Sequence, residues 1–363
     1  MPTRRRTRLG YVCFDFITKG ADGVSEEKDL AGEINRHLAA AADKILPLAV
    51  CTGILTALSF VTDVYAVSPL NFGGNTPVAQ FFRDLSEIIS RLILPLWSAC
   101  IACSVARRAG FYAGFVGGAI VCSGGAGFWA AMAAGFIAGY MVNYGKKNFT
   151  RLPQNWRECR FTVIYPLFAI IVTGYVAMYI LNPPAGSLFN WLPDNLSRPV
   201  GDSPALTGFI LGALPILDIN GPWSRGAWFT GASLLTDGEC HVMARVMAGE
   251  MVPPLVIAVT ALWRRKIFTP DELACAKLNF FCGLTAVIMG VFPFAARDPW
   301  RVVPACLIGS GIAGALTATF DCTIYASAGG ILAAQGLNSP ALFVVAVAVG
   351  TVTGAAIFMK IKK

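Results

Sequence analysis

The chain has 363 residues, of which 55% are hydrophobic and only 14% are charged. Because soluble domains carry about 25% charged residues, this composition excludes an ordinary soluble domain. The apolar runs are too long and continuous for barrel strands, so the sequence predicts an all-α integral membrane protein. The formal net charge is +8. Clustered basic residues are typical of cytoplasmic loops, an interpretation that we prefer to nucleic-acid binding.

The N-terminal segment, residues 1–43, is polar and charged and has none of the features of a secretory signal. We expect it to be cytoplasmic. Leu30, Ile34, Leu38 and Ile45 recur at helical spacing, which predicts an amphipathic helix over residues 29–45 on the membrane face.

About ten apolar segments follow, although a spanning helix needs roughly 20 residues and several segments are shorter or broken by glycine and proline. They are residues 46–66, 88–106, 109–123, 128–144, 161–181, 205–221, 242–263, 275–296, 302–321 and 340–359.

The topology is predicted from the basic pairs. With a cytoplasmic N-terminus, Arg107 and Lys146 also lie inside, and the polar loop 183–204 falls outside. Residues 222–240 and 322–339 are too polar to span and too apolar for ordinary loops, so we expect re-entrant hairpins that line a cavity. The sequence thus predicts a scaffold over residues 44–182 and a working part over residues 205–363.

Residues 291–304 form a polar, proline-broken stretch between two apolar runs and contain Arg297, Asp298 and Arg301. Charges beside membrane-length segments must be solvated in a cavity, by protein or at an interface. This stretch therefore points to the place where the chain handles something polar.

No cofactor or metal site is expected. The chain has eleven cysteines, most of them inside apolar runs, where cysteine behaves as a small hydrophobe. Cys100 and Cys103 match the C-x-x-C spacing, but no second pair or histidine follows at ligand spacing. With only two histidines, His37 and His241, a phosphohistidine relay is also poorly supplied.

The second half carries an ordered series of motifs: Asp218-Ile219-Asn220-Gly221-Pro222, Met251-Val252-Pro253-Pro254, Pro293-Phe294-Ala295-Ala296 with Asp298-Pro299, Arg301-Val302-Val303-Pro304, and Gly329-Gly330-Ile331. In this order and spacing the chain resembles the membrane-embedded IIC component of fructose-type sugar phosphotransferase systems, over roughly residues 40–363.

This resemblance implies a homodimer in the lipid of the bacterial inner membrane, with both termini cytoplasmic. A dimer scaffold of residues 44–182 would carry a mobile transport domain of residues 205–363 with re-entrant hairpins. The sugar would leave inside as a phosphate ester, and the phosphoryl group would come from a separate IIB partner fed by IIA. The chain itself would supply no phosphorylatable residue, because its task is to position the acceptor hydroxyl.

Two departures from the family pattern concern the sugar. Where the family has Thr-Glu-Gly, this chain has Ile288-Met289-Gly290, and the family's Pro-His-Gly-Gly is Ser327-Ala328-Gly329-Gly330. Methionine and alanine cannot accept hydroxyl protons as a carboxylate or imidazole can. The resemblance therefore implies a pocket that lacks both expected polar groups.

New charges stand where the family has small residues, namely Glu250, Arg245 and Arg297. One interpretation is structural: Arg245 or Arg297 pairs with Glu250 or Asp298 near an interface. The other is a rewired pocket in which Glu250 supplies the missing carboxylate. The expected substrate-binding residues are Asp218, Asn220, Gly221, Ser224, Arg225, Glu250, Met289, Pro293, Phe294, Ser327, Ala328 and Gly329.

We predict a fructose-like permease component that moves a sugar or polyol for phosphorylation by IIB. The alternative is a divergent facilitator or membrane sensor that is no longer coupled to phosphorylation. An unrelated ion-coupled transporter would explain the hairpins but not the ordered motifs.

Overall fold

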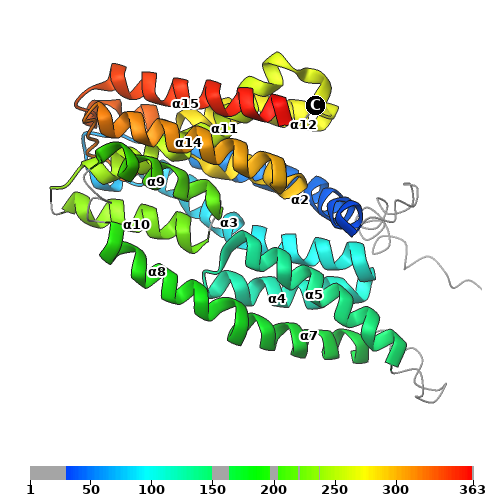
Figure 1. Cartoon of the computed structure of the whole chain (residues 1–363). Helices are drawn as coiled ribbons and strands as arrows, with labels where there is room; N and C mark the ends of the chain where they lie inside the picture. The colour runs from blue at the N-terminus through cyan, green and yellow to red at the C-terminus, as the bar shows by residue number, and fades with distance from the viewer. Residues whose placement is uncertain (1–29, 149–162, 197–202, 220, 237, 362–363) are drawn as a thin grey trace, which may run out of the picture.

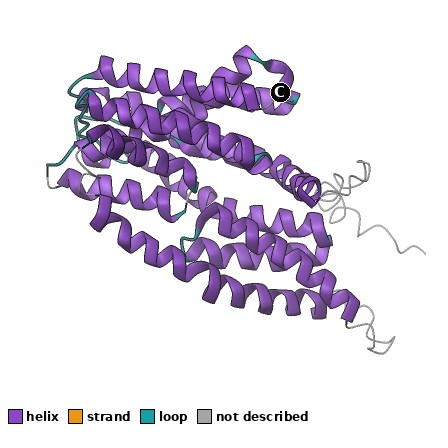
Figure 2. Ribbon diagram, in the orientation of Figure 1, coloured by secondary structure: helices purple, strands orange, loops and turns teal. Residues whose placement is uncertain are grey.

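A computed structural model describes residues 30–148, 163–196, 203–219, 221–236 and 238–361 (Figure 1). Within these ranges the fold is helical and has no strand, only an isolated bridge between Ile324 and Leu337, which confirms the all-α prediction (Figure 2). Asn220, one of the predicted site residues, lies outside the described residues.

The first half contains α2 (Leu30–Val61), α3 (Pro77–Ala106), α4 (Arg108–Ser123), α5 (Gly127–Asn148), α7 (Tyr165–Val176) and α8 (Asn182–Leu196). The second half contains α9 (Pro204–Leu217), α10 (Pro222–Thr236), α11 (His241–Trp263), α12 (Pro270–Leu284), α13 (Phe292–Arg297), α14 (Pro299–Thr319) and α15 (Pro340–Ile361). Short turns complete the list: η1 (Pro69–Asn71), the π-helical η5 (Ala177–Leu181), η6 (Arg265–Ile267), η7 (Ile288–Val291) and η8 (Gly330–Gly336).

Six stretches of the described residues are long and apolar enough to cross a membrane: Glu33–Val61, Pro77–Ala106, Tyr165–Leu188, His241–Trp263, Pro299–Thr319 and Pro340–Ile361. The protein is therefore a multi-pass helical membrane protein, with six segments rather than about ten meeting both criteria. The predicted segment 205–221 contains only the 14-residue helix α9, and segment 275–296 is divided into α12, η7 and α13.

Two segments differ from the sequence prediction. The predicted interfacial helix 29–45 is the first part of α2, which continues through Pro47 to Val61. Its apolar residues Leu38 and Ile45 are buried within the protein, so they do not lie on the membrane surface. The predicted loop 183–204 is helical as far as Leu196, because η5 joins α7 to α8 without a break.

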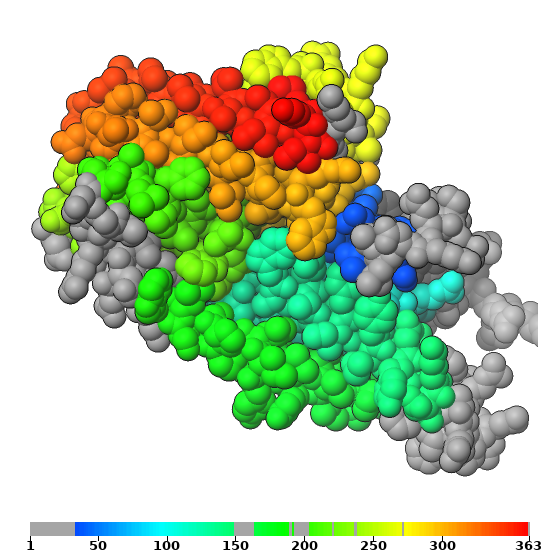
Figure 3. Space-filling view, viewed as in Figure 1, coloured from blue at the N-terminus to red at the C-terminus, as the bar shows by residue number. Residues whose placement is uncertain are grey.

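Two groups of helices are visible. Helices α4, α5 and α7 pack together, and α9, α11, α14 and α15 form a second group (Figure 1). In the space-filling view, α14 and α15 form the upper layer and α4, α5 and α7 the lower one (Figure 3). The N-terminal end of α2 and the C-terminal end of α15 lie at the same end of the molecule.

Glycines set the spacing inside the second group. A Cβ atom at Gly212 of α9 would lie 2.5 Å from the carbonyl oxygen of Ser310 in α14. A Cβ at Gly309 of α14 would lie 2.6 Å from the carbonyl oxygen of Gly350 in α15. Because these backbones touch, the helices approach as closely as small residues allow. We call this contact the glycine seam.

The polar stretch 291–304 folds as α13 followed by the start of α14. Phe292 packs edge-on against Trp97 of α3 and Phe128 of α5, with ring centroids 6.0 and 5.5 Å away. This aromatic cluster joins α13 to the first half of the chain, and aromatic pairs in such geometry contribute beyond the area that they bury.

Arg297 pairs with neither Glu250 nor Asp298, so the structural interpretation had the wrong partners. Its Nη1 atom lies 3.0 Å from Asp43 of α2 and 3.0 Å from Glu272 of α12. Asp298 instead pairs with Arg301, at 3.3 Å. The reason is that α13 packs against α2, which brings Arg297 beside Asp43.

We expect Arg297→Met to destabilise the protein by about 3 kcal/mol, because it leaves the buried carboxylate of Glu272 without its cation. Asp43→Asn is the control: the Asp43 side chain is 59% exposed, so its loss should cost about 0–1 kcal/mol. Thermal unfolding of the detergent-solubilised variants measures both. Equal losses would contradict this assignment.

Candidate substrate site

The Asp218 carboxylate lies at the C-terminal end of α9 and is buried. Its Oδ1 accepts a hydrogen bond from the backbone N–H of Phe128 at 2.9 Å. This N–H belongs to the first turn of α5, where helix donors have no partner in the helix. The adjacent indole N–H of Trp129 donates to the Leu217 carbonyl at 2.8 Å. The start of α5 therefore holds the turn that leads into α10.

Gly127 makes this contact possible. Its φ is +81°, and a Cβ atom there would lie 2.6 Å from both carboxylate oxygens of Asp218 and would also strike Gly221. Glycine is the residue that adopts this backbone conformation at no steric cost. The turn at Asp218 thus requires a glycine at the start of α5, which the sequence analysis did not single out.

Helix α10 carries two of the predicted residues. Ser224 is buried, and Arg225 lies near the α4–α5 turn, with its Nη1 3.8 Å from a Cβ placed at Gly125. One turn after Ser224, the indole N–H of Trp228 donates to the Ser327 carbonyl at 2.9 Å. Helix α10 therefore connects the Asp218 turn to the segment between α14 and α15 that contains Ser327, which we call the Ser327 hairpin.

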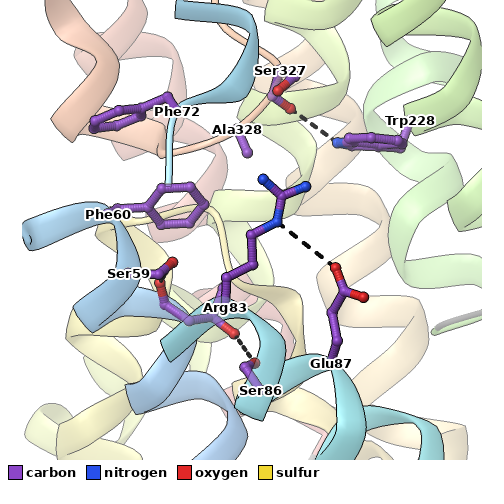
Figure 4. A pocket seen from close by; sticks show the side chains of 10 residues that line it. Ser59, Phe60, Phe72, Arg83, Ser86, Glu87, Trp228, Ser327 and Ala328 are labelled. Atoms are coloured by element: carbon purple, nitrogen blue, oxygen red, sulfur yellow. Dashed lines mark hydrogen bonds and ion pairs between the residues drawn. The ribbon is translucent and has the colours of Figure 1, made fainter. Parts of the chain in front are cut away.

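A cavity of about 240 Å³ opens between α2, α3, α10 and this hairpin (Figure 4). Its lining combines hydroxyls, aromatic rings and two charges: Thr56, Ser59, Phe60, Phe72, Arg83, Ser86, Glu87, Trp228, Ser327 and Ala328. Pockets for drug-sized ligands have volumes of about 300–1,000 Å³, so this cavity suits a smaller solute. Aromatic walls with a few convergent polar groups are typical of a small-molecule site.

The loop between α2 and α3 closes one side of the cavity. The Ser327 hydroxyl donates to the Leu70 carbonyl at 2.9 Å, and Asn71 accepts from Arg83 Nη1 at 3.0 Å. The loop is itself held by Asp63, which accepts from the backbone N–H groups of Gly73, Asn75 and Thr76 at 2.6, 3.0 and 3.0 Å.

The structure brings only part of the predicted site together. Ser327 and Ala328 line the cavity, and Gly329, with φ of +107°, packs beside Phe72 in its wall. Pro293 and Phe294 lie elsewhere, in a small cleft with Arg297. Met289 lies in η7 and is partly buried. Neither it nor Glu250 lines the cavity.

Glu250 lies on α11, and no hydrogen bond or ion pair connects its carboxylate to any described residue. Arg245, on the same helix, has a buried Nε without a hydrogen-bond partner among the described residues. His241, at the start of α11, lies 3.4 Å from Asp321, which is the structural contact expected of a lone histidine there. No group of histidine, cysteine and acidic residues in the described ranges could hold a metal ion.

The sequence analysis missed Arg83 and Glu87, the two charged residues of the cavity. A signal for them exists. They are four residues apart on α3, which has the length and composition of a membrane span, and charges in such helices usually mark a site.

The fold and cavity define a class: a multi-pass helical membrane protein with a small polar site between its two halves. The family model "Phosphotransferase system, EIIC" matches residues 44–309, and the chain belongs to this family.

Curated relatives agree. The chain is 36% identical to the fructose permease IIC component of Bacillus amyloliquefaciens, over 83% of this chain and 98% of that protein. It is 35% identical to the fructose-specific EIIABC component of Bacillus subtilis, over 90% of this chain but only 52% of that protein. Fructose-like permease IIC component 2 of Escherichia coli is 30% identical over 88% of each. The chain thus spans about half of a multidomain relative and nearly all of a single-component one.

We expect Gly127→Ala to lower the yield and thermal stability of the folded protein more than Gly125→Ala. Both glycines have positive φ, +81° and +70°, so both variants carry a backbone strain of about 1–2 kcal/mol. Only the methyl group at position 127 meets the Asp218 carboxylate, because position 125 has room. Unfolding in detergent measures the difference, and equal losses would show that the Asp218 contact does not matter.

The Asp63 interaction should depend on pH. Partial burial opposes its ionisation, but the backbone N–H groups of Asn75, Gly73 and Thr76 outweigh burial and lower the pKa of the Asp63 carboxyl from 3.8. A lowered folded pKa means that the stabilisation is present above pH 3.8 and is lost as the pH falls through the folded value.

Asp63→Asn should therefore unfold at a lower temperature than the unmodified chain at pH 7, by an amount equal to about 1–2 kcal/mol, since the carboxylate is only partly buried. The difference should shrink as the pH falls below 3.8. A difference that stays constant with pH would contradict this account.

Proposed function

We propose that this IIC component binds fructose, or a sugar or polyol of similar size, and exposes it to the cytoplasm for phosphorylation by a separate IIB. Two features support the proposal. The chain belongs to the EIIC family, and its cavity collects hydroxyl, charged and aromatic side chains around a small volume. One relative is a fructose permease IIC component, and another combines EIIC with EIIB in a fructose-specific protein.

The single observation that carries the proposal is where the cavity lies. One wall comes from α2 and α3, within residues 44–182, and the other from α10 and the Ser327 hairpin, within residues 205–363. A site between a scaffold and a mobile domain can open to one membrane face and then the other, as alternating access requires.

The orientation in the membrane is part of the proposal. We place both termini in the cytoplasm of a bacterial inner membrane, and the basic residues near the ends of α11 and α15 agree with this orientation. The cavity then lies near the outer end of α2 and is positioned to receive solute from outside.

The dimer is part of the proposal. Helix α7 exposes Leu167, Ile171 and Tyr175, and this apolar face suits lipid or a second copy of the scaffold. Phosphoryl chemistry belongs to IIB, so this chain contributes by positioning an acceptor hydroxyl and excluding water.

The test uses membrane vesicles that contain this chain and are loaded with its cognate IIB, already phosphorylated. We expect radiolabelled D-fructose to arrive as a phosphate ester, because phospho-IIB transfers its phosphoryl group to the sugar, and replacing it with unphosphorylated IIB should abolish that product. Accumulation only as free sugar, with or without IIB, would overturn the coupled mechanism and favour a facilitator. Membership of the phosphotransferase-system family, and relatives that join EIIC to EIIB, favour the coupled function.

A further inference from the structure

Arg83 and Glu87 are the charged side chains of the cavity lining, and both come from α3. They face Ser327 and Ala328 across the cavity, and the Arg83 guanidinium points toward Ala328 (Figure 4). Ala328 offers no polar side-chain atom, so the charged groups of the cavity lining come from α3 alone.

Glu87 keeps most of its capacity to accept hydrogen bonds. Its Oε1 lies 3.7 Å from Arg83 Nε, and its Oε2 lies 3.6 Å from Arg91 Nη2. A close pair between a charged nitrogen and a carboxylate oxygen is about 2.7–2.9 Å long, so both contacts are loose. A ligand hydroxyl can therefore donate to either oxygen without displacing a strong ion pair.

The Arg83 side chain is also held in an orientation that suits ligand binding. Its Nη1 donates to Asn71 Oδ1 at 3.0 Å, which fixes the plane of the guanidinium against the loop between α2 and α3. The guanidinium carries five N–H donors, of which this contact uses one, and Nε lies toward Glu87. One loop contact thus orients the side chain and leaves donors for a solute.

The simplest competing explanation is a solvated helix surface, because Arg83, Glu87 and Arg91 follow one another at spacing of four. Two observations argue against it. The Arg83 contact reaches a different element, and the rings of Phe60, Phe72 and Trp228 line the same cavity as the pair. The Arg83 and Glu87 side chains are 43% and 54% exposed, as is expected in a cavity that is open to solvent.

We infer that Arg83 and Glu87 form the charged recognition element of the cavity, and that it selects a neutral, hydroxylated solute. The two formal charges cancel, so an additional ligand charge has no partner among the side chains that line the cavity. Glu87 accepts from solute hydroxyls, Arg83 donates to solute oxygens, and the aromatic walls cover the apolar face of the solute. This inference rests on the proposed function and names the residues that select its substrate.

The chain offers a matched control. Arg91 also contacts Glu87 but does not line the cavity, and its side chain is 76% exposed. Arg91→Gln therefore changes the charge beside Glu87 without touching the site. Glu87→Gln keeps the shape and removes the charged acceptor, and Arg83→Lys keeps the charge and removes the planar fork.

The experiment measures equilibrium binding of radiolabelled D-fructose, D-mannitol and D-gluconate to the purified full chain in detergent, without IIB. We expect a neutral member of this set to bind, and Glu87→Gln to weaken it about 10- to 100-fold. Arg83→Lys should also weaken it, whereas Arg91→Gln should change binding by less than about threefold. Unfolding temperatures establish that each variant is folded, and Glu87→Asp replaces Glu87→Gln if the latter does not fold.

Three results would overturn the inference: binding of D-gluconate alone, no binding of either neutral solute, or equal effects of the Glu87 and Arg91 variants. The assay contains no phosphoryl donor. A chain that transports without phosphorylation would still show the Glu87 dependence but would fail the vesicle test, so the two proposals can fail separately.

Discussion

One buried carboxylate connects the two halves of this membrane protein. Asp218 ends α9, and it satisfies a backbone donor at the start of α5, more than 80 residues earlier in the chain. A charged group inside an apolar protein is costly unless hydrogen bonds satisfy it, so the turn has little freedom to move. From there α10 begins, and α10 positions Trp228 against the hairpin that forms one wall of the cavity. The position of that wall therefore depends on a contact distant from it.

The cavity is assembled from elements that are distant in sequence, so its lining combines aromatic, charged and hydroxyl groups. Aromatic rings come from the end of α2 and the following loop, charges come from α3, and backbone and hydroxyl groups come from the hairpin. The α2–α3 loop joins these contributions, because it accepts from Ser327 on one side and from Arg83 on the other. A loop of this kind belongs to the site as much as the helices do.

The length of the apolar segments and the order of the motifs were enough to predict the helical membrane fold and the family. Both can be recognised in short stretches of sequence, without knowing which stretches meet in space. The site was predicted only in part. Ser327 and Ala328 line the cavity, but Pro293 and Phe294 pack beside Arg297, and Glu250 contacts no charged partner among the described residues. Spacing along one segment cannot reveal that α3 turns Glu87 toward a hairpin about 240 residues later. Arg297 was likewise assigned the wrong partners because α2 approaches α13 only in the folded bundle.

The glycine seam has a mechanical consequence. At Gly212 and Gly309 the helices meet backbone to backbone, so no long side chains stand between them that could change rotamer and let one helix slide past the next. A shift along the seam would force main-chain atoms to collide, so α9, α14 and α15 resist sliding past one another. In the proposed transport cycle, relative motion would therefore fall outside the seam, at the cavity between α3 and the Ser327 hairpin. The part of the molecule that recognises the solute would thus also be its most deformable boundary.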